Sequence, residues 1–186
     1  MSIREGTQRS SGRRRQARYR PVVVVSKCLG FGVCRYDGEP VECPGISCLQ
    51  EEVDFLAVCP ELALGLPVPR PPLHLVRTDA GIRLIHSGTL SDLTEEMTAF
   101  CRAFFARHPR VSAAILKERS PSCGIADAVV RTASGSIVSR AGSGLFAAAC
   151  VAHLGPRHVV PSRQICSEAG RKRFVFLLRQ AAAARR

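Results

Sequence analysis

Short apolar runs alternate with longer amphipathic stretches along this chain. Three runs, at residues 21–25, 53–58 and 111–116, have the length and the valine or isoleucine content of strands buried on both faces of a sheet. Residues 73–77 and 82–86 are two further strand-like segments, and the Asp-Ala-Gly turn between them predicts a hairpin. These five segments supply most of the strands that the sequence predicts.

Helices are predicted in the second half of the chain. One should begin at Ser91, a residue type that caps helices, and end at His108, before a proline. Residues 143–154 form another, which stops at a Gly-Pro pair and leads to a short strand at 157–160. Because strands alternate with helices, the predicted fold is a single α/β domain with a mainly parallel, Rossmann-like sheet flanked by helices.

Two segments that contain proline interrupt this regular pattern. Residues 39–50 suit a connecting helix, but Pro44-Gly45 interrupts it. Residues 60–72 contain five prolines and are expected to form an extended, stiff loop.

The formal net charge of +12 belongs to the two ends of the chain. Residues 1–20 carry seven arginines and one glutamate, residues 171–186 carry six basic residues and no acid, and the part between them is neutral. We therefore predict a disordered basic leader over 1–20, the α/β domain over 21–165 and a basic C-terminal helix over 166–186. Basic ends suit weak, sequence-independent contact with nucleic-acid phosphates. The competing interpretation is a solvated tail and a solvated last helix.

No apolar stretch approaches the ~20 residues that a membrane span needs. The arginine-rich start is not followed by an apolar segment before Pro21, so a secretory signal is not expected. We predict a cytoplasmic protein. Its nine cysteines, an odd number, then favour reduced thiols or metal ligation over disulfides. No two of them have CxxC spacing, which argues against most zinc ribbons and fingers.

Three of the cysteines each lie just past the end of a predicted buried strand: Cys28, Cys59 and Cys123. In an open parallel sheet the carboxyl ends of the strands meet at one edge, and ligand sites form there. The three thiols are therefore expected to converge on one point. A metal centre with three thiolate ligands and one vacant coordination position is typical of a catalytic rather than a structural site. The competing interpretation is that each cysteine is a small buried apolar residue.

Three sequence blocks contain these cysteines and resemble the signature blocks of the thiouracil desulfidase family, a family long known only from bacterial sequences. They are SKCLGFGVCRYDG at 26–38, VCPE at 58–61 with GLPVPR at 65–70, and ILKERSPSCG at 115–124. The resemblance implies a 4Fe–4S cluster held by Cys28, Cys59 and Cys123, with one open iron. It also implies catalytic roles for Glu61 and Ser120.

The implied chemistry is consistent with the residues. A soft iron prefers sulfur to oxygen and polarises a thiocarbonyl, so that water attacks its carbon. Glu61 lies two residues after Cys59, within reach of the site as a general base. Ser120 lies three residues before Cys123, within reach as a proton carrier. The products are an oxo base and sulfide, with no net redox change. The predicted substrate is a 2-thiouracil-like thiolated nucleobase or a related thioamide.

Several alternatives remain open on the sequence. Three further cysteines lie near Cys28 in the sequence: Cys34, Cys43 and Cys48. If one of them is a fourth ligand, the metal centre has no vacant position. The competing interpretation of Glu61 is that it caps a loop, and that of Ser120 is that it caps a turn before a proline.

Two other function classes also compete with the desulfidase. One is a zinc hydrolase with a three-cysteine site, and the other is a basic RNA-associated protein without catalysis. One departure from the family pattern bears on the substrate. The Cys43-Pro44-Gly45 insertion lies where a more regular helix is expected, beside the approach to the site.

Overall fold

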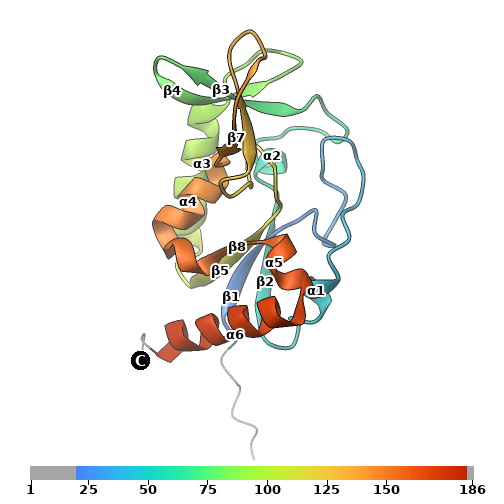
Figure 1. Ribbon diagram of the computed structural model, residues 1–186, viewed down its shortest axis with the longest axis vertical. Coiled ribbons are helices and arrows are strands. Elements are labelled where there is room, and N and C mark those ends of the chain that lie inside the picture. Colours follow the sequence, from blue (N-terminus) through green and yellow to red (C-terminus); the bar gives the residue numbers. More distant parts are fainter. Residues whose placement is uncertain (1–19, 184–186) are drawn as a thin grey trace, which may run out of the picture.

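A parallel sheet of four strands lies at the centre of the fold, as the sequence predicts (Figure 1). The computed structural model describes residues 20–183, so the predicted basic leader falls outside the described residues apart from Arg20. The strand order is β2-β1-β5-β8, and every neighbouring pair is parallel. The strands span Val22–Ser26 (β1), Asp54–Val58 (β2), Val111–Leu116 (β5) and Val159–Pro161 (β8). The last strand is shorter than predicted, because Pro156–His158 form a 3₁₀ turn (η1).

A second sheet, in the order β4-β3-β6-β7, lies at one end of the molecule (Figure 1). Its first hairpin is the predicted one, β3 (Leu73–Thr78) with β4 (Gly81–His86). Its second hairpin, β6 (Ala128–Arg131) with β7 (Ile137–Gly142), is absent from the sequence prediction. No residue of β7 is buried, so this strand lacks the apolar pattern that reveals the others.

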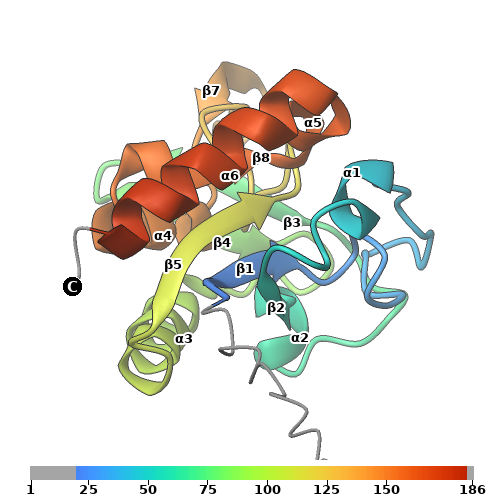
Figure 2. The ribbon, with the colours of Figure 1, turned by 90° about the horizontal axis from the view of Figure 1, so that it is seen from below.

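The parallel sheet separates two apolar cores. Successive residues of a strand point to opposite faces, and in β1 Val24 joins one cluster while Val23 and Val25 join the other. The first cluster includes α3 (Thr94–Arg107) and α4 (Leu145–Leu154), and the second includes α6 (Glu168–Ala183). Figure 2 shows α3 and α6 on opposite sides of the strands.

The ends of two helices differ from the sequence prediction. Helix α3 begins at Thr94 rather than Ser91, because a bridge between Asp92 and Ile85 of β4 keeps that segment extended. The Asp92 carboxylate accepts the Thr94 amide hydrogen at 2.9 Å. Helix α6 begins at Glu168, and its Phe174 and Leu178 are buried in the second core. This last helix is therefore part of the packed fold.

The two segments that contain proline match the prediction only in part: residues 39–43 are not helical and residues 64–72 form a loop, but a short helix begins at each of two prolines. Pro44 does not interrupt a helix but opens the short helix α1 (Pro44–Ser47), and Pro60 likewise opens α2 (Pro60–Ala63) in the segment predicted to be an extended loop. Proline suits the first turn of a helix, where its missing N–H has no intrahelical partner. Another short helix, α5 (Ser162–Cys166), precedes α6. No helix within residues 20–183 is long and apolar enough to cross a membrane.

Candidate active site

A cavity of about 500 Å³ opens at the carboxyl ends of the parallel strands. It is lined by all three cysteines of the sequence prediction: Cys28 two residues after β1, Cys59 directly after β2, and Cys123 in the loop after β5. The structure therefore brings together three thiols from distant parts of the chain. Glu61 and Ser120 line the same cavity.

Local backbone contacts fix each thiol in place. After β1 the chain turns tightly, with the Leu29 amide donating to Ser26 O at 2.9 Å. Cys59 is the N-cap of α2, yet its thiol makes no capping hydrogen bond and faces the cavity. The loop that carries Cys123 is held against the start of α4, where the Ala147 amide donates to Ser122 O at 3.1 Å.

Cys34 is a fourth thiol in this cavity. Its side chain is buried, and the Cys59 thiol hydrogen-bonds with the Cys34 carbonyl oxygen at 3.8 Å. Of the three spare cysteines considered as a fourth ligand, it is the one beside the others. Cys43 lies at a different cavity, and Cys48 is exposed at the end of α1.

Three thiols of the cavity, those of Cys34, Cys59 and Cys123, have raised pKa values. Burial, helped by the nearby Glu61 and Cys59, raises the pKa of the Cys123 thiol to about 12. A hydrogen bond with Cys28 raises the pKa of Cys34 to about 11, and a hydrogen bond with Cys34, then burial, raise that of Cys59 far above its ordinary value. A bound metal is what favours the thiolate form of such groups.

The donor set suits an iron–sulfur cluster. Clusters are held by cysteine thiolates, each on a different iron, so the ligands surround a cavity rather than a single point. Three cysteines on three separate loops around one cavity have this arrangement. Within residues 20–183 no three His, Cys, Asp or Glu side chains are grouped as ligands of one metal ion.

The Glu61 carboxylate is held on both of its oxygens. Arg70 donates to Oε2 from Nε at 2.9 Å and from Nη2 at 2.6 Å, and the Ser122 hydroxyl donates to Oε1 at 2.9 Å. The Arg70 side chain is 2% exposed and that of Glu61 is 12% exposed. Arg70 also donates to the carbonyl oxygens of Pro67 and Cys34. The side-chain contacts of Glu61 are therefore those of a fixed ion pair at the cavity, and not those of a loop cap.

Ser120 and Ser122 have different tasks in the loop before Cys123. The Ser120 hydroxyl oxygen accepts the amide hydrogens of Ser122 at 3.2 Å and of Cys123 at 3.0 Å, which is the turn cap that its spacing suggested. Ser122 is fully buried, and sequence reasoning missed its contact with Glu61. The only signal was its place in the ERSPSCG string, which does not show which serine faces the glutamate.

Comparison with known proteins agrees with this geometry. Residues 23–160 match the 2-thiouracil desulfurase family. The chain belongs to this family. It is 36% identical over 135 residues to the uncharacterized protein YbbK of Bacillus subtilis, across 68% of this chain and 87% of YbbK. It also resembles the solved structure of the [4Fe-4S]-dependent thiouracil desulfidase TudS, with a TM-score of 0.57 and 30% identity over 78% of this chain and 93% of TudS.

The matched region of the 2-thiouracil desulfurase family contains the whole cavity wall. Every lining residue, from Ser26 to Cys123, falls within residues 23–160. The mouth includes Arg35 and Tyr36, and the Arg35 guanidinium pairs with Asp37 at 2.6 Å. Tyr36 is 44% exposed, and the Arg70 amide donates to its carbonyl oxygen at 2.8 Å. The Arg-Tyr-Asp-Gly string therefore shapes the cavity mouth and is tied to the Glu61 ion pair.

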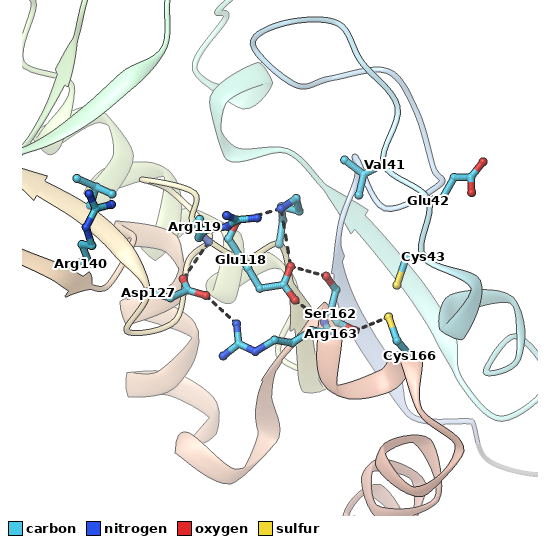
Figure 3. A pocket seen from close by; sticks show the side chains of 12 residues that line it. Val41, Glu42, Cys43, Glu118, Arg119, Asp127, Arg140, Ser162, Arg163 and Cys166 are labelled. Atoms are coloured by element: carbon cyan, nitrogen blue, oxygen red, sulfur yellow. Dashed lines mark hydrogen bonds and ion pairs between the residues drawn. The ribbon is translucent and has the colours of Figure 1, made fainter.

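The charged Lys117-Glu118-Arg119 segment separates this cavity from a second one of about 580 Å³. Glu118 lies in the wall of both and accepts hydrogen bonds from the Ser162 hydroxyl at 2.8 Å and from the Arg163 amide (Figure 3). Lys117 pairs with the same carboxylate at 3.8 Å. The segment is thus a network of ion pairs and hydrogen bonds that joins β5 to α5.

Proposed function

We propose that this protein is a 4Fe–4S-dependent, non-redox desulfidase that removes sulfur from a 2-thiouracil-like nucleobase or a related thioamide. The observation that carries the proposal is the convergence of Cys28, Cys59, Cys123 and Glu61 on one cavity from three separate sequence blocks. Membership of the 2-thiouracil desulfurase family and similarity to a [4Fe-4S]-dependent thiouracil desulfidase support it.

Cys28, Cys59 and Cys123 would hold the cluster, which leaves one iron without a protein ligand. When bound, the cluster supplies a soft Lewis acid that polarises the thiocarbonyl group of the substrate. Cys34, which lines the same cavity, is a neighbour of the cluster in this proposal and not a ligand.

Glu61 acts as the general base. It accepts a proton from the water whose oxygen attacks the thiocarbonyl carbon. Arg70 and Ser122 fix the orientation of its carboxylate, so the base does not have to be reoriented during the reaction. The oxygen of water becomes the oxygen of the oxo base, and the sulfur leaves as hydrosulfide. No electron is gained or lost overall.

Ser120 acts as the proton donor to the sulfur of the substrate, opposite to the attacking water. Its oxygen accepts two amide hydrogens, so its lone pairs are engaged while its own hydrogen remains a donor. The hydroxyl is therefore oriented by the backbone toward the Cys123 side of the cavity. There it donates to the sulfur of the substrate as negative charge develops.

Anaerobic reconstitution with iron and sulfide tests the proposal. The expected result is a cluster absorption band with four irons per chain, and release of sulfide from 2-thiouracil. Cys123→Ser should lose both, whereas Cys48→Ser, which alters an exposed thiol outside the cavity, should retain both. A cluster that forms without sulfide release from any thiolated base defeats the substrate assignment. Stoichiometric zinc without iron in anaerobically purified protein favours the three-cysteine hydrolase instead.

A further inference from the structure

The close approach of two short helices leaves a second pair of thiols side by side, outside the candidate active site. Helix α1 packs its Gly45 against the backbone of α5, where a Cβ at Gly45 would overlap the carbonyl group of Ile165. Because only glycine permits this approach, the residue before α1 and the last residue of α5 lie next to each other. These residues are Cys43 and Cys166.

The two sulfur atoms point toward each other at the edge of the second cavity (Figure 3). Both side chains line this cavity, and the Cys166 thiol lies close enough to Cys43 to raise the pKa of the Cys43 thiol. The Cys166 thiol is also 3.5 Å from Ser162 O. Cys43 is 9% exposed, whereas Cys166 is exposed to solvent. One thiol is therefore accessible to a reagent, and its neighbour is sheltered behind it.

We propose that Cys43 and Cys166 form a reversible disulfide when the protein meets a thiol-directed two-electron oxidant such as a peroxide. Residues 43–45 supply both the first thiol and the glycine that places it. The modification is independent of the desulfidase reaction, since neither thiol lines the cluster cavity.

The chemistry is a two-step oxidation. Peroxide transfers one oxygen atom to the exposed Cys166 sulfur, which gives a sulfenic acid and one water. The Cys43 sulfur then attacks the Cys166 sulfur, the S–O bond breaks, and hydroxide leaves with the Cys43 proton as a second water. Two thiols and one peroxide thus become one disulfide and two waters. Burial, then the nearby Cys166, raise the pKa of Cys43 to about 11, so the second step should accelerate as the pH rises.

A disulfide here joins two distant parts of the chain. Cys43 ends the loop that carries Cys28 and Cys34, and Cys166 ends the helix whose Ser162 and Arg163 hold Glu118. The cross-link restricts the unfolded chain between these positions, so it should stabilise the fold against heat. It also fastens the wall shared by the two cavities.

Treatment of the full-length, anaerobically reconstituted protein with diamide, which takes up the same two hydrogens at its N=N bond, tests the proposal. We expect the intact mass to fall by two hydrogen atoms and peptide mapping to find Cys43 linked to Cys166. The melting temperature should rise, and a reductant should reverse both changes. Cys166→Ser should abolish the link and the rise, and the matched control Cys48→Ser should keep both. Gly45→Ala should slow cross-linking by roughly 10–100-fold, because it displaces one reacting sulfur.

Two results overturn the proposal. One is the absence of any cross-link at an oxidant concentration that modifies Cys166. The other is a link from Cys166 or Cys43 to Cys48, or to a cysteine of the cluster cavity, in place of the link between the two.

Discussion

Arg70 and Glu61 form a largely buried ion pair that joins the loop before β3 to helix α2 in the wall of the candidate active site. Two nitrogens of the guanidinium contact Oε2 of the carboxylate, at 2.9 and 2.6 Å. The same guanidinium holds the carbonyl oxygen of Cys34 at 3.0 Å. The pair therefore fixes the orientation of the proposed base and the position of a cavity loop at the same time.

Removal of the Arg70 guanidinium should leave the largely buried Glu61 carboxylate without its cationic partner. We expect Arg70→Met to lower the free energy of unfolding by about 3–5 kcal/mol, because a broken buried pair retains the cost of burying one charge. The double variant Arg70→Met with Glu61→Gln removes both charges and should regain most of that stability. Urea denaturation measures these differences.

Activity should respond differently from stability in the same two variants. The double variant lacks the base, so its rate of sulfide release should stay at the level of Glu61→Gln alone, lower than the wild type by roughly 10²–10⁴-fold. Recovery of activity together with stability would show that Glu61 has a structural role only.

The two serines of the ERSPSCG string should be separable by mutation. Ser120→Ala leaves the amides of Ser122 and Cys123 without their acceptor, at a cost of about 0.5–2 kcal/mol in stability, and removes the proposed proton carrier. Ser122→Ala removes a hydrogen bond to Glu61 Oε1 and should lower activity through the orientation of the base. The measurement is kcat for sulfide release in each serine variant, alone and combined with Glu61→Gln.

The expected pattern follows from which residue each serine contacts. Ser122→Ala should have little further effect once Glu61 is Gln, whereas Ser120→Ala should still reduce the residual rate. The opposite pattern contradicts these roles.

The sequence predicted the parallel sheet because its strands are apolar throughout. All six residues of β5 are buried, and this run, 111–116, was predicted with its exact bounds. Strand β7 was missed because none of its residues is buried, so it lacks the apolar pattern that marks the other strands. The short helices α1 and α2 were not predicted, because Pro44 was taken to interrupt a helix and Pro60 to begin an extended loop, whereas proline favours the first turn of a helix.

The part of the candidate site that follows directly from the ends of the parallel strands could be predicted from the sequence. Cys28, Cys59 and Cys123 follow strands whose order in the sheet brings them to one edge, so their convergence follows from the topology. The contacts of Glu61 were not predictable, because Arg70 and Ser122 reach it from loops whose paths depend on tertiary packing. The contact between Cys43 and Cys166 likewise needs the structure, since it depends on how closely α1 approaches α5.

The start of helix α3 should make stability depend on acid pH. Hydrogen bonds from Thr94 hold the pKa of Asp92 below its usual value of 3.8. A lowered folded-state pKa contributes stability that is present above the unfolded-state value and is lost as the pH falls through the folded-state value. Asp92 is 43% exposed, so Asp92→Ala should cost only about 0.5–1 kcal/mol at pH 7.

This cost should vanish below the folded-state pKa of Asp92, where its carboxyl is neutral. Urea denaturation of both proteins between pH 2 and pH 7 measures it, with Asp79→Ala, in the turn between β3 and β4, as the control substitution. If the stability difference between the wild type and Asp92→Ala is the same at pH 2 as at pH 7, the charge of Asp92 is not its cause.

Cys34 decides whether the proposed cluster keeps an open iron. It lines the same cavity as Cys28 and Cys59, so it is placed either to neighbour the cluster or to complete its ligation. If the cluster has three cysteine ligands, Cys34→Ser should bind iron as the wild type does after anaerobic reconstitution, with an unchanged cluster spectrum, while Cys59→Ser should lose the cluster. An added thiol compound should then perturb the spectrum of the wild type and of Cys34→Ser equally, because both have an iron with an exchangeable position. Loss of cluster iron in Cys34→Ser, or a response to added thiol only in that variant, would instead assign Cys34 as the fourth ligand and rule out an open iron in the resting protein.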